Sequence, residues 1–281
     1  MARLDGKALA AAAAGSSFGW SFLLLPKHRR LAMRILYAFC RQVDDLADEA
    51  PSVEAGRRGL MAWLECLQGR PAASPLEEAV GWIIHEHGVP ASALQEVVEG
   101  ALSDLRPLVR FDSRAEVERY CHQVAGAVGL ACLPLFGAGP GQGAAFAEAL
   151  GQALQGANIL RDVREDALRG RLYFARQDLA RHGVDEAAWM RLKPGAGALP
   201  LLAEHAERVQ ARFDEARRLG QGLPGADLRP AWAMADVYEA LLHQMRAQGF
   251  KVFEARPRAS AWLKLRCLLK QALRPAPRQG A

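Results

Sequence analysis

The stretch ILYAFCRQVDDLADE (35–49) combines an apolar stripe with a polar one, both at helical spacing. The apolar residues recur every three or four positions, which predicts a helix over 27–50 that begins just after Pro26. Four polar residues step along it by four, three and four positions: Tyr37, Arg41, Asp44 and Asp48. They therefore share one face, where two carboxylates one turn apart could bridge hard cations. The alternative is an ordinary solvated acidic face.

A second stretch, QALQGANILRDVREDALRGRLYF (152–174), has the same character. The residues of its polar stripe step by three, four and four positions: Gln155, Asn158, Asp162 and Asp166. Gly151 extends this stripe and leaves space beside it, while Leu154, Ile159 and Val163 are expected on the opposite side. Arg161 and Glu165 are expected to form an i,i+4 ion pair. Chance matches to such a stripe do occur in polar helices.

The two stripes mean more together than either does alone. Four unpaired aspartates facing a helical core would be costly, and divalent cations with an anionic ligand would offset that cost. Mg²⁺ prefers a few carboxylates plus phosphate oxygens. The pattern thus predicts a site where Mg²⁺ binds a diphosphate and makes it a leaving group, so that an allylic substrate yields a carbocation. SSFGWSFLLLP (16–26) and VAGAVG (124–129) could supply dry cavity walls or ordinary core packing.

The rest of the chain also reads as helix, and no stretch of β alternation exceeds a few residues. Loops are expected at 137–143, 169–173 and 193–200, which are rich in Gly or polar residues. The sequence therefore predicts one all-α domain over residues 1–281, with 274–281 as a frayed tail. The further helices are expected at 76–87, 90–105, 114–136 (interrupted by VAGAVG), 144–168, from Arg176, 199–221 and 228–249.

Composition excludes several classes of protein. The chain has 281 residues, of which 51% are hydrophobic and 24% charged, so a large core is expected rather than disorder. Its five cysteines show no CxxC spacing, which is typical of a reduced, cytoplasmic protein without a zinc site. The net charge of +5 fits a polyanionic ligand. Basic residues do not interleave with aromatics, so no nucleic-acid partner is expected. MARLDGKALAAAAAG reads as a helix rather than a signal peptide, and no membrane span is predicted.

The C-terminal stretch mixes basic and apolar residues at helical spacing. Its basic residues are Lys264, Arg266, Lys270, Arg274 and Arg278, and its apolar ones are Trp262, Leu265, Leu268, Leu269 and Leu273. Such a helix could lie on anionic lipid at the inner membrane surface, or pack as an ordinary terminal helix.

Four motifs occur in an order that resembles the squalene/phytoene synthase family, the head-to-head prenyl transferases. These are SSFGWSFLLLP, YAFCRQVDDLADE, YCHQVAGAVG (120–129) and NILRDVREDALRGRLYF, and the likeness spans residues 14 to 265. EGALSDLRPLVRFD (99–112) and VYEALLHQMRAQGFKVF (237–253) make the chain most similar to bacterial presqualene diphosphate synthases of hopanoid-type pathways. Ser103–Asp104 departs from the more hydrophobic–acidic pair of relatives.

The resemblance implies a role for individual residues. Asp44 and Asp48 match the first metal-binding pair, and Asn158, Asp162 and Asp166 match the second set. Residues matched to the diphosphates are Tyr37, Arg41, Arg171 and Tyr173, with Tyr238 and Arg256 closing over them; those matched to the prenyl cavity are Ser17, Phe18, Phe22, Tyr120, Val124, Gly129 and Gln155.

The resemblance also implies a reaction, in which Mg²⁺ assists loss of diphosphate from one prenyl diphosphate and a second one attacks the cation. Two farnesyl diphosphates would give presqualene diphosphate, and some relatives continue to squalene with NADPH. The sequence leaves open that second step, the oligomeric state and the choice of C15 or C20 substrate. A phytoene-type synthase using geranylgeranyl diphosphate is the nearest alternative. A terpene cyclase is another alternative, but it would not be expected to carry YAFCR, VAGAVG and RGRLYF. A catalytically inactive assembly factor is a third, but such proteins usually lose some of the metal-site acids, which are all present here.

Overall fold

The computed structural model describes residues 19–139, 141–223 and 225–275. Within these ranges the chain is all-α, as predicted, and contains no strand. The helical elements are η1 (Ser21–Leu24), α2 (Lys27–Asp48), α3 (Val53–Leu67), α4 (Pro75–His87), α5 (Ala91–Asp104), α6 (Arg114–Cys121), η2 (His122–Gly126), α7 (Ala127–Phe136), α8 (Ala144–Arg161), α9 (Val163–Leu168), α10 (Arg176–Arg181), α11 (Glu186–Met190), α12 (Ala198–Gly220), α13 (Arg229–Ala247), η3 (Lys251–Phe253) and α14 (Ala261–Ala272).

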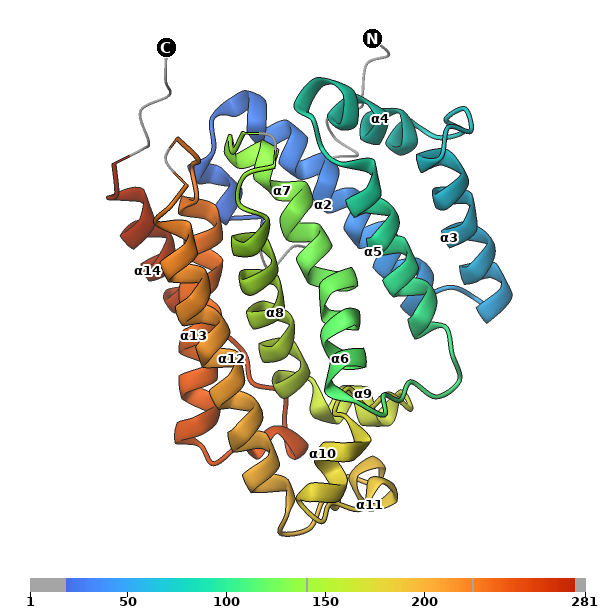
Figure 1. Cartoon of the computed structure of the whole chain (residues 1–281), viewed down its shortest axis with the longest axis vertical. Helices are drawn as coiled ribbons and strands as arrows, with labels where there is room; N and C mark the ends of the chain where they lie inside the picture. The colour runs from blue at the N-terminus through green and yellow to red at the C-terminus, as the bar shows by residue number, and fades with distance from the viewer. Residues whose placement is uncertain (1–18, 140, 224, 276–281) are drawn as a thin grey trace.

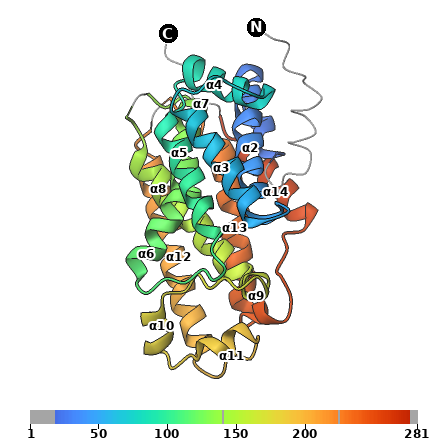
Figure 2. The same cartoon turned by 90° about the vertical axis from the view of Figure 1, so that its right-hand side faces the viewer.

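Helix α8 occupies the middle of the bundle. It packs against α12 and α13 on one side and against η2 and α7 on the other (Figure 1). Helix α5 packs against α2 and also against η2 and α7. The short helices α9, α10 and α11 lie together at one end of the long ones in both views (Figure 2). The apolar faces of the long helices meet in one large core cluster, so α2 and α8, which carry the two predicted acidic stripes, are fixed relative to each other.

Two of the predicted helices contain a local change of geometry, one of them at the interruption expected at VAGAVG. The helix expected over 114–136 passes through a π-helical turn, η2, at His122–Gly126. There the backbones of η2 and α8 approach so closely that a Cβ on Gly151 would lie 2.6 Å from the amide nitrogen of Gly126. The helix expected over 144–168 is divided at Asp162, which has φ −99° and ψ 8°. The backbone hydrogen bonds nevertheless continue through it, since its amide donates to the Asn158 carbonyl at 2.8 Å and its carbonyl accepts from the Asp166 amide at 2.9 Å.

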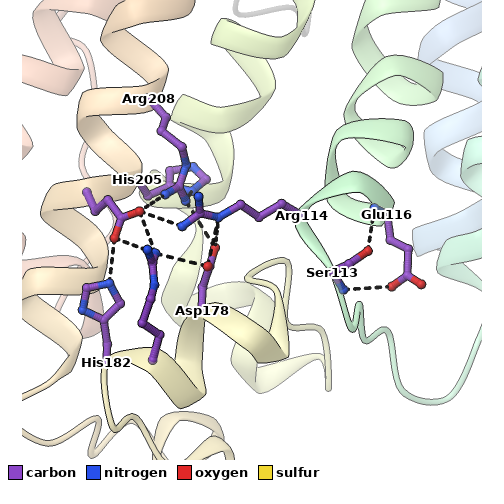
Figure 3. A network of polar contacts seen from close by, with 9 residues as sticks. Ser113, Arg114, Glu116, Asp178, His182, His205 and Arg208 are labelled. Carbon is purple, nitrogen blue, oxygen red and sulfur yellow. Dashed lines mark hydrogen bonds and ion pairs between the residues drawn. The ribbon is translucent and has the colours of Figure 1, made fainter.

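A network of ion pairs fixes the end of the bundle at which α9, α10 and α11 lie. Helix α6 begins with a capping box between Ser113 and Glu116, and the next residue of that turn, Arg114, reaches to α10 and α12 (Figure 3). Arg114 Nε lies 2.7 Å from Asp178 Oδ2, and Arg114 Nη2 lies 2.6 Å from Glu204 Oε1. These contacts hold the start of α6, and so set where Tyr120, near its end, is placed.

No helix among the described residues is both long enough and apolar enough to cross a bilayer.

Candidate active site

A cavity of about 590 Å³ lies between α2, α5, α6, α7, α8 and α13. Every predicted site residue in the described part of the chain contributes to its wall; Ser17 and Phe18 lie outside the described residues. The predicted residues that line it are Phe22, Tyr37, Arg41, Asp44, Asp48, Tyr120, Val124, Gly129, Gln155, Asn158, Asp162, Asp166, Arg171, Tyr173, Tyr238 and Arg256.

The first acid pair, on α2, has one paired and one unpaired carboxylate. Asp48 forms ion pairs with two arginines of the loop after α9. Its Oδ2 lies 2.7 Å from Arg169 Nη1, and its Oδ1 lies 2.7 Å from Arg171 Nη1. No ion pair joins Asp44 to any described residue. Its carboxyl lines the cavity, where desolvation, together with repulsion from Asp48, raises its pKa from 3.8 to about 7. Arg41, although on the same face, bonds Asp45 instead at 2.8 Å.

The second acid pair, at the junction of α8 and α9, repeats this arrangement. Asp162 is held by Arg161 Nη2 at 2.6 Å and by Arg256 Nε at 2.7 Å. Desolvation and repulsion from Asp162 raise the pKa of Asp166 from 3.8 to about 8. The expected Arg161–Glu165 pair is wrong: Arg161 turns to Asp162 and to the Tyr238 hydroxyl, and Glu165 bonds Arg256 Nη1 at 3.0 Å.

The residues around the two pairs fit a divalent cation. Asn158 Oδ1 is buried in the cavity wall without a hydrogen-bond partner among the described residues, while its Nδ2 donates to Gln155 Oε1. An orphaned acceptor one turn from Asp162 is suited to a cation, because Mg²⁺ takes oxygen ligands. In the described part of the chain no group of three or more His, Cys, Asp or Glu side chains is placed to hold a metal ion by itself, so a cation here would need further ligands from a bound anion. Paired acids of this kind leave coordination positions for phosphate oxygens.

Away from the acids, the cavity wall is apolar and aromatic. Phe22 packs edge-on against Tyr37 with ring centroids 6.1 Å apart. Gly129 lets α7 approach α8, since a Cβ there would lie 2.9 Å from the Ala147 carbonyl oxygen. Leu154 and Ile159, expected on the side of α8 away from the polar stripe, also line the cavity. Leu154 is one turn from Asn158, so it belongs to the same face. This wall would surround a hydrocarbon chain and exclude water.

Asp104, at the C-terminal end of α5, is a site residue that the sequence did not reveal. Its Oδ2 accepts a hydrogen bond from the Tyr120 hydroxyl at 2.8 Å, and its Oδ1 accepts one from the Tyr173 hydroxyl at 2.9 Å. The two tyrosine rings stack with centroids 4.9 Å apart. Desolvation raises the pKa of Asp104, although Arg171 and both hydroxyls oppose the rise. A lone acid at a helix end has no periodic signal, and only the departure at Ser103–Asp104 pointed to it.

A second cavity, of about 310 Å³, adjoins the ion-pair network of Figure 3. Its charged side chains are paired with one another or with the network: Arg114 pairs with Asp178, and Arg208 Nη1 lies 2.7 Å from Glu204 Oε1. Burial lowers the pKa of His205 to about 4, so its ring is neutral and bonds the Gly156 carbonyl at 3.1 Å. These pairings indicate that the network holds α6, α10 and α12 together. The acids without an ion-pair partner line the larger cavity instead.

The raised pKa values predict how pH affects metal-free protein. Asp44 and Asp166 bind protons more tightly when folded than when unfolded, so their contribution to stability falls as pH rises from about 4 through about 7 to 8. We expect the Tm of wild type in chelator, relative to that of Asp166→Asn, to decrease over this window. Mg²⁺ with inorganic diphosphate should remove the difference. A difference in Tm that is constant from pH 4.5 to 8.5 would contradict this prediction.

Comparison with known proteins gives a consistent family. The family model described as squalene/phytoene synthase matches residues 11–263. A phytoene synthase from Thermus thermophilus is 36% identical over 270 residues, covering 92% of this chain and 88% of the relative. A presqualene diphosphate synthase from Zymomonas mobilis is 34% identical over 256 residues, covering 88% of this chain and 86% of the relative.

A solved structure agrees with the sequence relatives. A dehydrosqualene synthase crystallised with a ligand superposes with a TM-score of 0.83 at 25% identity, over 95% of both chains. The helical arrangement of this chain is therefore shared with a dehydrosqualene synthase across nearly its whole length.

Proposed function

The chain belongs to the squalene/phytoene synthase family, and we propose that it condenses two farnesyl diphosphates head to head into presqualene diphosphate. The observation that carries this proposal is a cavity of about 590 Å³ that has two acid clusters with their arginines in one part of its wall and apolar and aromatic side chains in the rest. Such a cavity suits a substrate with a polyanionic head and a hydrocarbon tail. The likeness to the Zymomonas mobilis enzyme supports this substrate, and the likeness to the Thermus thermophilus enzyme supports a C20 alternative.

The acids would hold Mg²⁺ in two groups, Asp44 with Asp48 and Asn158 with Asp162 and Asp166. When bound, Mg²⁺ supplies charge neutralisation that makes diphosphate a better leaving group. The arginines of the site add to this, because Arg171 and Arg256 can exchange their present carboxylate partners for phosphate oxygens. We infer that diphosphate binding and metal binding support each other, since metal would satisfy the carboxylates that the arginines release.

Once a cation forms, the chain must shield it and accept one proton. The aromatic faces of Phe22, Tyr120 and Tyr173 line the cavity and can stabilise positive charge. When the cyclopropane closes, a C–H bond breaks and its electron pair forms the ring bond. We propose that this proton goes to the Tyr120 hydroxyl oxygen as that hydroxyl passes its own proton to Asp104 Oδ2, 2.8 Å away.

Product analysis tests the proposal directly. Purified protein with Mg²⁺ should consume two farnesyl diphosphates for each diphosphate released, and mass spectrometry should show a C30 cyclopropyl diphosphate. Parallel reactions with NADPH would show whether the product is reduced to squalene. A C15 hydrocarbon formed from one substrate molecule would indicate a terpene cyclase, and a C40 product from geranylgeranyl diphosphate would favour the phytoene-type alternative.

Phe22 is expected to limit chain length. It is nearly inaccessible to solvent, lines the cavity and packs on Tyr37, so a longer chain would have to displace a closely packed ring. Overpacking costs ~1–3 kcal/mol, or roughly 5–150-fold in selectivity. Phe22→Ala should therefore raise kcat/KM for geranylgeranyl relative to farnesyl diphosphate by a factor in this range.

A matched variant separates this effect from a loss of packing. Phe39→Ala truncates a fully buried phenylalanine on α2 that packs against Trp63 and does not line the cavity. It should lower stability and leave the ratio of kcat/KM values unchanged. If Phe22→Ala behaved in the same way, Phe22 would only support the wall. A wild type that prefers the C20 substrate would overturn the presqualene assignment.

A further inference from the structure

Helix α14 exposes a continuous apolar stripe. Eleven large apolar side chains are exposed in the described part of the chain, and four of them fall within twelve residues of α14 and the position after it. They are Trp262 (69% exposed), Leu265 (45%), Leu269 (52%) and Leu273 (86%). Their spacing of three, four and four places them on one side of the helix. The opposite side, with Cys267 and Gln271, is buried against α13. A clustered stripe of this kind indicates a contact surface.

The residues from 255 to the C-terminus, which include α14, account for the net positive charge of the chain. After Glu254 the sequence has seven of its 36 basic residues and none of its 31 acidic ones; without them, 29 basic residues would face 31 acidic ones. On α14, Lys270 Nζ bonds Asp236 Oδ1 at 3.0 Å. Lys264, Arg266 and Arg274 have no ion-pair partner among the described residues. The apolar stripe is thus accompanied by cations whose charge the fold does not neutralise.

The stripe also lies close to the cavity wall. Helix α14 is on the outside of the bundle beside α13 in Figure 1, and it contacts η1. In η1, Phe22 lines the cavity while the next residue, Leu23, is 54% exposed. The surface formed by α14 and η1 therefore adjoins the apolar side of the cavity.

From these observations we propose that the exposed face of α14 binds an anionic lipid bilayer. Apolar side chains on such a helix insert at the boundary between headgroups and acyl chains, and flanking lysines and arginines attract anionic headgroups. A second copy of the chain is a poorer occupant, because a symmetric contact would bring two sets of unneutralised cations together. A nucleic acid would leave the apolar stripe without a partner.

Binding of the full-length protein to vesicles tests this surface without substrate. Wild type is mixed with vesicles of pure phosphatidylcholine or of phosphatidylcholine with phosphatidylglycerol, and the bound fraction is measured by sedimentation. We expect binding to the anionic vesicles that weakens as salt is raised. Leu265→Glu/Leu269→Glu and Lys264→Gln/Arg266→Gln/Arg274→Gln should each lower the partition coefficient about tenfold or more, since each removes apolar insertion or several headgroup contacts.

Leu199→Glu is the matched control, because Leu199 is 52% exposed on α12, far along the chain from α14. It should bind as wild type does, and circular dichroism should show all variants folded. Equal binding of wild type and the α14 variants, or no binding by wild type, would overturn the proposal. So would equal binding to neutral and anionic vesicles, which would remove the role of charge. A wild-type dimer that Leu265→Glu/Leu269→Glu converts to monomer, without vesicle binding, would identify a second copy as the partner.

Discussion

Replacing Asp44 or Asp166 by asparagine is expected to lower kcat roughly a thousandfold while raising the Tm of metal-free protein at pH 8. A metal ion that neutralises a leaving group supplies several kcal/mol of transition-state stabilisation, at about 1.4 kcal/mol per factor of ten. Neither carboxylate has an ion-pair partner among the described residues, and the pKa of each is raised, to about 7 and about 8. Asparagine keeps an oxygen in place but removes a charge that the folded protein disfavours.

The variants of the paired acids should behave differently. Asp162→Asn would also lower kcat, but it would leave Arg161 and Arg256 without their closest carboxylate. A partly buried charge that loses its partner destabilises the fold, so Asp162→Asn should lower the Tm. All of these variants should lose activity, but the Tm should rise for Asp44→Asn and Asp166→Asn and fall for Asp162→Asn. The sign of the Tm change therefore distinguishes a metal ligand without an ion-pair partner in the metal-free protein from one that has such a partner.

Asp45→Asn provides the control for the first variant. It makes the same chemical change on α2, one residue from Asp44, and removes only an exposed ion pair with Arg41. Activity should stay within about twofold of wild type. Turnover in excess chelator, or an Asp44→Asn enzyme with near-normal kcat at saturating Mg²⁺, would contradict a metal role for these acids.

The sequence predicted the helices and the two acidic faces because both depend on local spacing. Residues three or four apart share a face of a helix wherever the helix packs, so the stripes of α2 and α8 could be read before the fold was known. The break at Asp162 and the π turn at His122–Gly126 were not predicted as such. Both lie where distant parts of the chain make contact: the backbone of α8 at Gly151 approaches the π turn, and the guanidinium of Arg256 binds Asp162.

The partners of the charged residues could not be predicted, because they come from distant parts of the chain. Local spacing suggested Glu165 as the ion-pair partner of Arg161. Instead, Arg161 donates a hydrogen bond to the hydroxyl of Tyr238, which lies 77 residues away in the sequence. Asp104 meets Tyr120 and Tyr173 across 16 and 69 residues. The sequence therefore identifies which side chains face the cavity more readily than which acids are neutralised within it, and that second property decides the expected pKa values.

The relay through Asp104 gives the second large expected effect. If the proton lost on ring closure passes through the Tyr120 hydroxyl, Tyr120→Phe and Asp104→Asn should each lower kcat about 10²–10⁴-fold, the range for general acid–base catalysis. Asp104→Asn keeps an oxygen near both hydroxyls but cannot accept a proton. Tyr120→Phe keeps the ring that stacks on Tyr173, so KM should change little.

A double variant tests whether the two residues act as one unit. Tyr120→Phe/Asp104→Asn should be about as slow as the slower single variant, because a relay broken once loses its whole contribution. Losses that multiply would show that Asp104 and Tyr120 contribute independently. Tyr173→Phe identifies which hydroxyl carries the proton: Tyr173 also bonds Asp104, at 2.9 Å, but is not the proposed donor. It should therefore cost much less than Tyr120→Phe, and the reverse order would assign the proton to Tyr173.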